Sequence, residues 1–107
     1  MRTLDKFYIN GEWVAPKGTD VRDIINPSNE DVSGKMALGT RADVDAAVLA
    51  ARQAFASFGY TSKQERLEMM DALIAEFEKR MDEMAALITL EMGAPKGFAA
   101  DAQAPSG

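Results

Sequence analysis

The sequence contains neither cysteine nor histidine. Without cysteine there is no disulfide framework, no thiolate nucleophile and no cysteine-ligated zinc or iron–sulfur site. Without histidine the chain lacks the commonest general base, and with it any Ser-His or Cys-His pair. Neither a G-x-G-x-x-G motif nor a complete P-loop motif occurs. We therefore expect no catalytic residue and no cofactor-binding residue in this chain.

Basic charge and long hydrophobic runs are also scarce. The formal net charge is −5, whereas nucleic-acid binding requires a basic surface. No apolar run approaches the ~18 residues that span a bilayer, and no signal peptide opens the chain. We therefore expect neither a nucleic-acid nor a membrane partner, and a cytoplasmic location by default.

The 107 residues have room for one domain, and residues 1–39 are predicted to form strands and turns. Asn10-Gly11 separates two β-prone segments, 7–9 and 12–14, which is the strongest short-range signal for a hairpin. Further short strands are predicted at 23–25 and 32–38. Pro27 separates them, because proline lacks the N–H that a strand donates.

A first helix is predicted over residues 40–59. Thr40 is the candidate N-cap, and Asp43 lies three residues later, near the positive end of the helix dipole. Apolar residues then recur at helical spacing along one face: Val44, Ala47, Val48, Ala51, Phe55 and Phe58. Gly59 is the predicted end of this helix.

A second helix is predicted over residues 61–93, where Thr61 with Gln64 and Ser62 with Glu65 form two overlapping capping boxes. Its apolar residues follow a 3-4 spacing: Leu67, Met70, Ile74, Phe77, Met81, Met84 and Ile88. Unbroken, it would be about 46 Å long, against a radius of gyration of ~13 Å for a domain of this size. The helix therefore either breaks near 79–82 or projects toward something else. Residues 94–107 are predicted to form a loop and a short helix, which makes the chain α+β: a hairpin and short strands, then two to three amphipathic helices.

The apolar stripe of the second helix has two interpretations. One is an intramolecular core shared with the first helix. The other is a seam for a partner helix. The acidic residues on the same helix are interpreted as a solvated face, because no calcium-loop pattern accompanies them. Glu91 differs, because an acid at a helix C-terminus is opposed by the dipole, which suggests a compensating cation.

Five segments in series resemble a known family. They read FYINGEWV at 7–14, INPSN at 25–29, ADVDAA at 42–47, AARQAF at 50–55 and TLEMGAP at 89–95. In this order and spacing they resemble the N-terminal portion of the NAD(P)-dependent aldehyde dehydrogenase superfamily. The resemblance covers nearly the whole chain.

The resemblance implies a longer parent enzyme that oxidises aldehydes to carboxylic acids with NAD or NADP. Its cysteine nucleophile, glutamate base and Rossmann-like cofactor domain all lie beyond the matched stretch. This chain is then one partial domain of an α/β enzyme, catalytically inactive alone, with the rest of the parent as its partner. The alternative is a non-catalytic helical module for interaction or oligomerisation, which self-associates through exposed apolar helix faces.

The resemblance also implies one site. Many relatives hold a monovalent cation, Na⁺ or K⁺, through backbone carbonyls that correspond to Ile24 and Ile25 and an acid that corresponds to Glu91. The family often has Asp at the last position, and a further ligand comes from beyond residue 107, so we expect weak occupancy and no tightly bound cofactor. Relatives also carry a helix-capping Asn where this chain has Arg80, which leaves open whether the second helix breaks.

Overall fold

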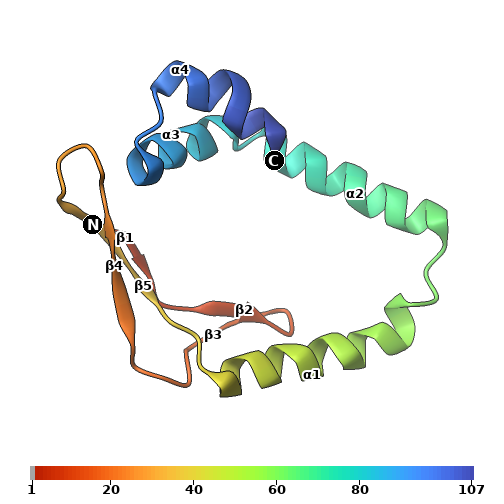
Figure 1. The fold of residues 1–107 in the computed structure, drawn as a ribbon. Coiled ribbons are helices and arrows are strands. Elements are labelled where there is room, and N and C mark those ends of the chain that lie inside the picture. Colours follow the sequence, from red (N-terminus) through yellow and green to blue (C-terminus); the bar gives the residue numbers. More distant parts are fainter. Residues whose placement is uncertain (1) are drawn as a thin grey trace. The chain divides into compact units, whose positions relative to one another are not determined.

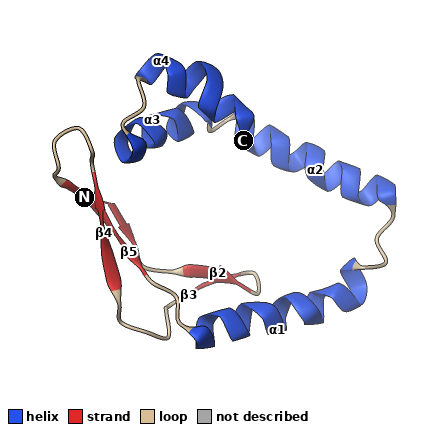
Figure 2. Cartoon of the chain, viewed as in Figure 1, coloured by secondary structure: helices blue, strands red, loops and turns tan. Residues whose placement is uncertain are grey.

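A computed structural model describes residues 2–107, which form two compact units (Figure 1). Unit 1 comprises residues 2–24 and 32–61, and unit 2 comprises residues 25–31 and 62–107. The first group of elements is β1 (Arg2–Leu4), β2 (Phe7–Ile9), β3 (Glu12–Val14), β4 (Val21–Ile25), β5 (Val32–Ala37) and α1 (Arg41–Phe58). The second group is α2 (Lys63–Glu78), α3 (Met81–Met92), α4 (Lys96–Phe98), η1 (Ala99–Gln103) and η2 (Ala104–Ser106). Short strands precede all the helices (Figure 2), which confirms the α+β class.

The predicted hairpin is present in unit 1 as the antiparallel pair β2–β3. Asn10 and Gly11 occupy its turn with φ angles of 55° and 80°, the left-handed values that a type I′ turn requires at both central residues. Tyr8 lies opposite Trp13 across the pair, and their ring centroids are 5.3 Å apart. Both rings are exposed, so this aromatic pair stabilises the outer face of the hairpin.

A second sheet has the strand order β1-β5-β4. The sequence patterns did not predict β1, which pairs in parallel with β5 and places Arg2 beside Gly34. A Cβ on Gly34 would lie 2.8 Å from the Arg2 carbonyl oxygen, so glycine permits this close approach. β1 and β5 are about thirty residues apart in the sequence, so no short sequence pattern predicts their pairing.

The start of α1 is fixed by a buried carboxylate. Asp43 accepts hydrogen bonds from the Thr40 N–H (2.8 Å), the Thr40 hydroxyl (2.8 Å) and the Lys17 N–H (2.9 Å). The side chain is only 5% exposed. These bonds, the Thr40 N–H first, hold the pKa of the Asp43 carboxyl below its ordinary value of 3.8, although burial opposes them. Asp43 thereby connects the loop at Lys17 to the helix N-terminus.

Neutralising Asp43 is expected to destabilise unit 1. Because its pKa is lowered on folding, the charged carboxylate contributes stability that is present above pH 3.8 and is lost as the pH falls through the folded value. Asp43→Asn should therefore lower the urea midpoint at neutral pH and flatten the acid limb of the stability profile. Asp45→Asn is the matched control, because Asp45 is exposed and only 3.9 Å from Arg41 in a surface ion pair. Equal acid limbs in the unchanged chain and Asp43→Asn would contradict this role.

The region 61–93, predicted as a helix that either breaks near 79–82 or projects, forms two helices, α2 and α3, separated at Lys79 and Arg80. Ser62 is the N-cap of α2, where its hydroxyl accepts from the Glu65 N–H at 3.1 Å and its own N–H donates to the Glu65 carboxylate at 2.6 Å. Thr61, a predicted alternative start, lies outside α2, and its hydroxyl donates to the Phe58 carbonyl. Arg80 leaves the helical region at φ −115° and ψ 10° without a side-chain cap.

The buried apolar residues among those described are three alanines, Ala85, Ala99 and Ala104. They lie where α3 meets η1 and η2 in unit 2, with Ile88 and Ala94 packed against them. Small side chains let these helical segments approach closely. No helix within residues 2–107 is long and apolar enough to cross a membrane.

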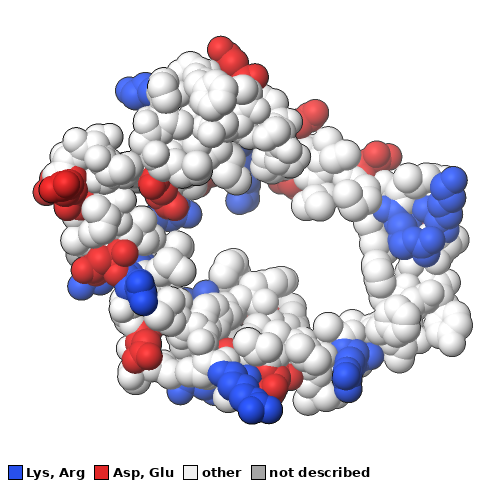
Figure 3. All heavy atoms as spheres, viewed as in Figure 1, with Lys and Arg blue, Asp and Glu red and all other residues white. Residues whose placement is uncertain are grey.

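The apolar stripe of α2 is partly exposed, since Leu67, Met70 and Ile74 are 47%, 52% and 50% exposed. Its two interpretations, a core shared with the first helix and a seam for a partner helix, both stay predictions, because α1 belongs to unit 1 and α2 to unit 2. Figure 3 shows a broad uncharged area over α3 and α4 in this view.

Candidate functional site

The turn after β4 is closed by its own polar groups. The Asn26 N–H donates to the Asp31 carbonyl at 2.9 Å, and the Asn26 side-chain oxygen accepts from the Ser28 N–H at 2.9 Å. Asn29 and Asp31 exchange two further hydrogen bonds. Glu30 adopts a φ of 62°. Its N–H donates a hydrogen bond to the Asn26 carbonyl at 2.8 Å. The Asn-Pro segment is thus a defined turn with a fixed backbone.

This turn contacts the C-terminal end of α3 within unit 2. Gly93 ends α3 in the left-handed region, at φ 73°, and its N–H donates to the Thr89 carbonyl at 3.0 Å. A Cβ on Gly93 would lie 3.1 Å from Cγ of Pro27. Two requirements therefore favour glycine here, the backbone conformation and the approach of Pro27.

Gly93→Ala is expected to lower the free energy of unfolding by about 1–2 kcal/mol, because a left-handed L-residue is strained, and the contact with Pro27 adds to this. Urea unfolding followed by helical circular dichroism measures the loss. Gly97→Ala is the matched control, since nothing lies within 4 Å of a Cβ there, and it should be neutral or stabilising. A loss at Gly97 as large as that at Gly93 would contradict the assignment.

The residues of the predicted cation site lie at these two segments. Ile24 and Ile25 are the last residues of β4, and Glu91 is exposed in α3, two residues before Gly93. Ile25 and Glu91 belong to unit 2, whereas Ile24 belongs to unit 1. The Ile24 carbonyl accepts a hydrogen bond from the Ser33 hydroxyl at 3.0 Å. Across residues 2–107 no group of three or more acidic side chains that could hold a metal ion is found.

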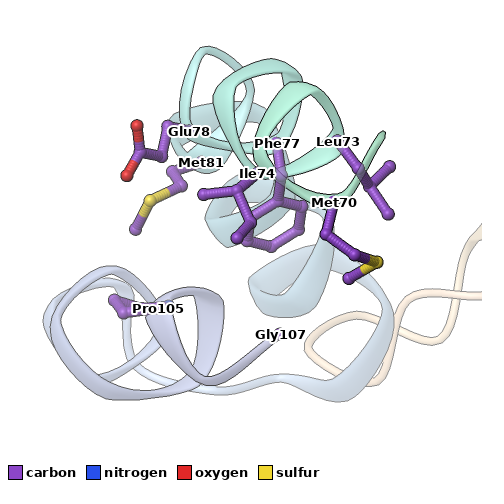
Figure 4. A pocket seen from close by; sticks show the side chains of 8 residues that line it. All are labelled: Met70, Leu73, Ile74, Phe77, Glu78, Met81, Pro105 and Gly107. Carbon is purple, nitrogen blue, oxygen red and sulfur yellow. The ribbon is translucent and has the colours of Figure 1, made fainter. Parts of the chain in front are cut away.

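Two features of the structure are absent from the sequence-based predictions. One is the bond from Lys17 to Asp43, which joins residues 26 positions apart; the pairing of Thr40 with Asp43 indicated the cap but not this distant donor. The other is an apolar groove in unit 2, with a volume of about 580 Å³, between α2 and the last residues of the chain (Figure 4). The 3-4 stripe was the available signal for the groove, and its sequence favoured an intramolecular core over a seam for a partner helix.

Comparison with known proteins identifies the family. The model of the aldehyde dehydrogenase family matches residues 13–106. The 3-succinoylsemialdehyde-pyridine dehydrogenase of Pseudomonas sp is 47% identical over 100% of this chain and 23% of that protein. A crystal structure of an aldehyde dehydrogenase from Bartonella henselae superposes with a TM-score of 0.96 at 39% identity, covering 99% of this chain and 22% of that one.

An aldehyde dehydrogenase C variant from Pseudomonas syringae, in complex with NAD⁺ and octanal, gives a TM-score of 0.91 at 40% identity over 94% of this chain and 21% of that one. The chain thus spans about a fifth of the length of the relatives it matches. The segment matched by the family model, 13–106, contains α1, α2 and α3. This chain belongs to the aldehyde dehydrogenase family and corresponds to an N-terminal portion of it.

Proposed function

We propose that this chain is the N-terminal portion of an oxidoreductase that oxidises aldehydes to carboxylic acids with NAD or NADP. The observation that carries the proposal is the family match over residues 13–106, in a chain that has no cysteine. The family's cysteine nucleophile and cofactor domain then belong to the rest of the enzyme. Residues 1–107 act as one partial domain against that body, in the cytoplasm. Aldehydes such as the pyridine semialdehyde named for the Pseudomonas relative are candidate substrates of the whole enzyme.

The uncovered apolar surface supports this role. Phe55, Phe58 and Tyr60 at the end of α1, and the stripe of α2, are exposed side chains of a kind that usually covers another apolar surface. Burial of such area releases about 25 cal/mol per Å². Covering it therefore provides the free energy that holds the chain to the remaining enzyme.

Co-expression tests the association. The chain is produced together with the part of the Pseudomonas relative that lies outside the matched segment, as two separate polypeptides with an affinity tag on the second. We expect the 107-residue chain to co-purify in a 1:1 ratio. Recovery of the tagged polypeptide alone would overturn the proposed function.

The monovalent cation site remains part of the proposal. Backbone carbonyls and a carboxylate are oxygen donors, which suit hard cations. A bound Na⁺ or K⁺ would supply positive charge beside Glu91 at the negative end of α3.

Sodium NMR line width measures weak cation binding to the chain. Addition of the chain to a sodium solution is expected to broaden the line, and Glu91→Gln is expected to remove most of the broadening. Glu83→Gln is the control, because it removes an equal charge from the first turn of the same helix. Equal broadening by the two variants would show that Na⁺ responds to net charge rather than to this site.

A further inference from the structure

The turn of the β2–β3 hairpin presents an asparagine that is followed by a glycine. Asn10 and Gly11 are both exposed, and the Asn10 side-chain amide has no hydrogen-bond partner among residues 2–107. Apart from its two chain neighbours, nothing lies within 4 Å of a Cβ built on Gly11. The side-chain carbonyl of Asn10 therefore meets no steric obstacle on its way to the Gly11 nitrogen. Such an approach begins succinimide formation, in which a backbone nitrogen displaces ammonia from the preceding asparagine.

Asn26 is followed by a residue that cannot attack it. The next residue is Pro27, whose ring nitrogen carries no hydrogen to lose. The Asn26 side-chain oxygen also accepts a hydrogen bond from the Ser28 N–H at 2.9 Å. We therefore expect Asn26 to keep its amide.

Asn29 is the third and last asparagine of the chain, and both of its side-chain polar atoms are bound. Its Nδ2 donates to the Asp31 carboxylate at 2.8 Å, and its Oδ1 accepts from the Asp31 N–H at 3.2 Å. The nitrogen that would attack it belongs to Glu30, whose N–H donates to the Asn26 carbonyl at 2.8 Å. Of the three asparagines, Asn10 is thus the one whose amide and following nitrogen are both accessible.

We propose that Asn10 is a site of spontaneous, intramolecular deamidation. The Gly11 nitrogen bonds to Cγ of Asn10 as the Cγ–Nδ2 bond breaks, and the departing amino group takes the proton of the Gly11 N–H and leaves as ammonia. Water then opens the succinimide at one of its two carbonyl carbons: the hydroxyl bonds to that carbon and the proton returns to the nitrogen. Nothing is oxidised or reduced, and water is the one co-reactant. The modification does not depend on the proposed function.

The two products affect the hairpin differently. Opening at Cγ gives aspartate, which type I′ turns accept before glycine, so the hairpin persists with one more negative charge. Opening at the main-chain carbonyl gives isoaspartate, in which the chain runs through Cβ and Cγ and the turn gains one backbone atom. Because loop length fixes the register of a hairpin, isoaspartate disrupts the pairing of Tyr8 with Trp13.

Ageing of the purified chain tests the proposal. The chain is incubated at mildly alkaline pH, and tryptic peptides are followed by mass spectrometry, which detects the exchange of –NH₂ for –OH. Trypsin places Asn10 in peptide 7–17 and both other asparagines in peptide 23–35, where fragment spectra distinguish them. We expect Asn10 to be converted at least tenfold faster than Asn26 and Asn29. An unmodified Asn10, or equal conversion of Asn29, would overturn the proposal.

Gly11→Ala tests the attacking nitrogen. The added methyl group hinders the attack, so we expect Asn10 to be converted at least fivefold more slowly. Alanine is also strained at the φ of 80° found here, but a loosened turn by itself would speed the reaction, so slower conversion reports the methyl group. Gly97→Ala is the control, because a Cβ there also meets nothing within 4 Å and no asparagine precedes it. Equal rates in the two variants would overturn the proposal.

The isoaspartate product is tested by its effect on the hairpin. Trp13 is the one tryptophan of the chain, and its ring centroid lies 5.3 Å from that of Tyr8, so its fluorescence reports the pairing. A methyltransferase specific for isoaspartate identifies the isoaspartate fraction after chromatography. We expect altered Trp13 emission in that fraction and unchanged emission in Asn10→Asp. Identical emission from both would overturn the predicted loss of the hairpin.

Discussion

The 107-residue chain alone is expected to leave NAD⁺ and NADP⁺ unreduced in the presence of any aldehyde. The chain has no cysteine, so it cannot form the covalent thioester intermediate of the proposed reaction. It also has no dinucleotide-binding motif to hold the hydride acceptor. The readout is NADH or NADPH absorbance over hours at high protein concentration. Aldehyde-dependent reduction by the purified chain would contradict the proposed function.

Activity is expected to appear when the missing part is supplied. The co-expressed complex with the remainder of the Pseudomonas relative should reduce NAD⁺ with that relative's semialdehyde at a rate ~100-fold or more above the chain alone. This is a modest demand, because enzymes commonly accelerate reactions by ~10⁶-fold or more. The control is the tagged remainder expressed by itself. A remainder that is fully active without this chain would show that residues 1–107 are not needed for the reaction.

Ala99→Leu is expected to lower the stability of unit 2. Ala99 is 0% exposed and lies with Ala85 and Ala104 in the small core. Added methylenes have no free volume there, and overpacking of this kind costs about 1–3 kcal/mol. The fall should appear as a lower urea midpoint in the circular dichroism of the helices.

Ala102→Leu is the matched control, because Ala102 is exposed on the same turn as Ala99 and leucine and alanine have similar helix propensity. It should change the midpoint little. A similar fall in both variants would show that the close approach of η1 to α3 does not depend on the alanine core.

Short sequence patterns correctly predicted the hairpin turn, the start of α2 and the end of α3. Asn10-Gly11 specified the hairpin because both residues adopt positive φ, and the Ser62–Glu65 capping box marks the start of α2. Gly93, predicted as a helix stop, ends α3. In each case the interacting residues are close together in the sequence, so a short sequence pattern includes all of them.

Interactions between distant residues were not predictable in this way. The pairing of β1 with β5 and the bond from Lys17 to Asp43 join segments whose sequences show no sign of each other. Helix length indicated a break near 79–82 as one of two outcomes, but no glycine or proline marks its position at Lys79 and Arg80. These features depend on tertiary packing between segments that are far apart in the sequence.

The candidate site was predictable only in part. The dipole argument singled out Glu91, and the family resemblance supplied Ile24 and Ile25 as its companions. The contact of Pro27 with Gly93 brings the segments of Ile25 and Glu91 together in unit 2, whereas Ile24 belongs to unit 1, so the cation site stays a prediction. The apolar groove between α2 and residues 105–107 was not predicted, because the stripe of Leu67, Met70 and Ile74 is compatible with a core or a seam.

Covalent labelling of exposed side chains tests the central claim most directly, namely that the remaining enzyme covers the apolar faces of this chain. Hydroxyl-radical labelling followed by mass spectrometry is applied to the chain alone and to the co-expressed complex. Met70 and Phe55, which are 52% and 69% exposed, should be labelled heavily in the chain alone and be at least fivefold protected in the complex. Equal labelling of both residues in the two samples would contradict the account.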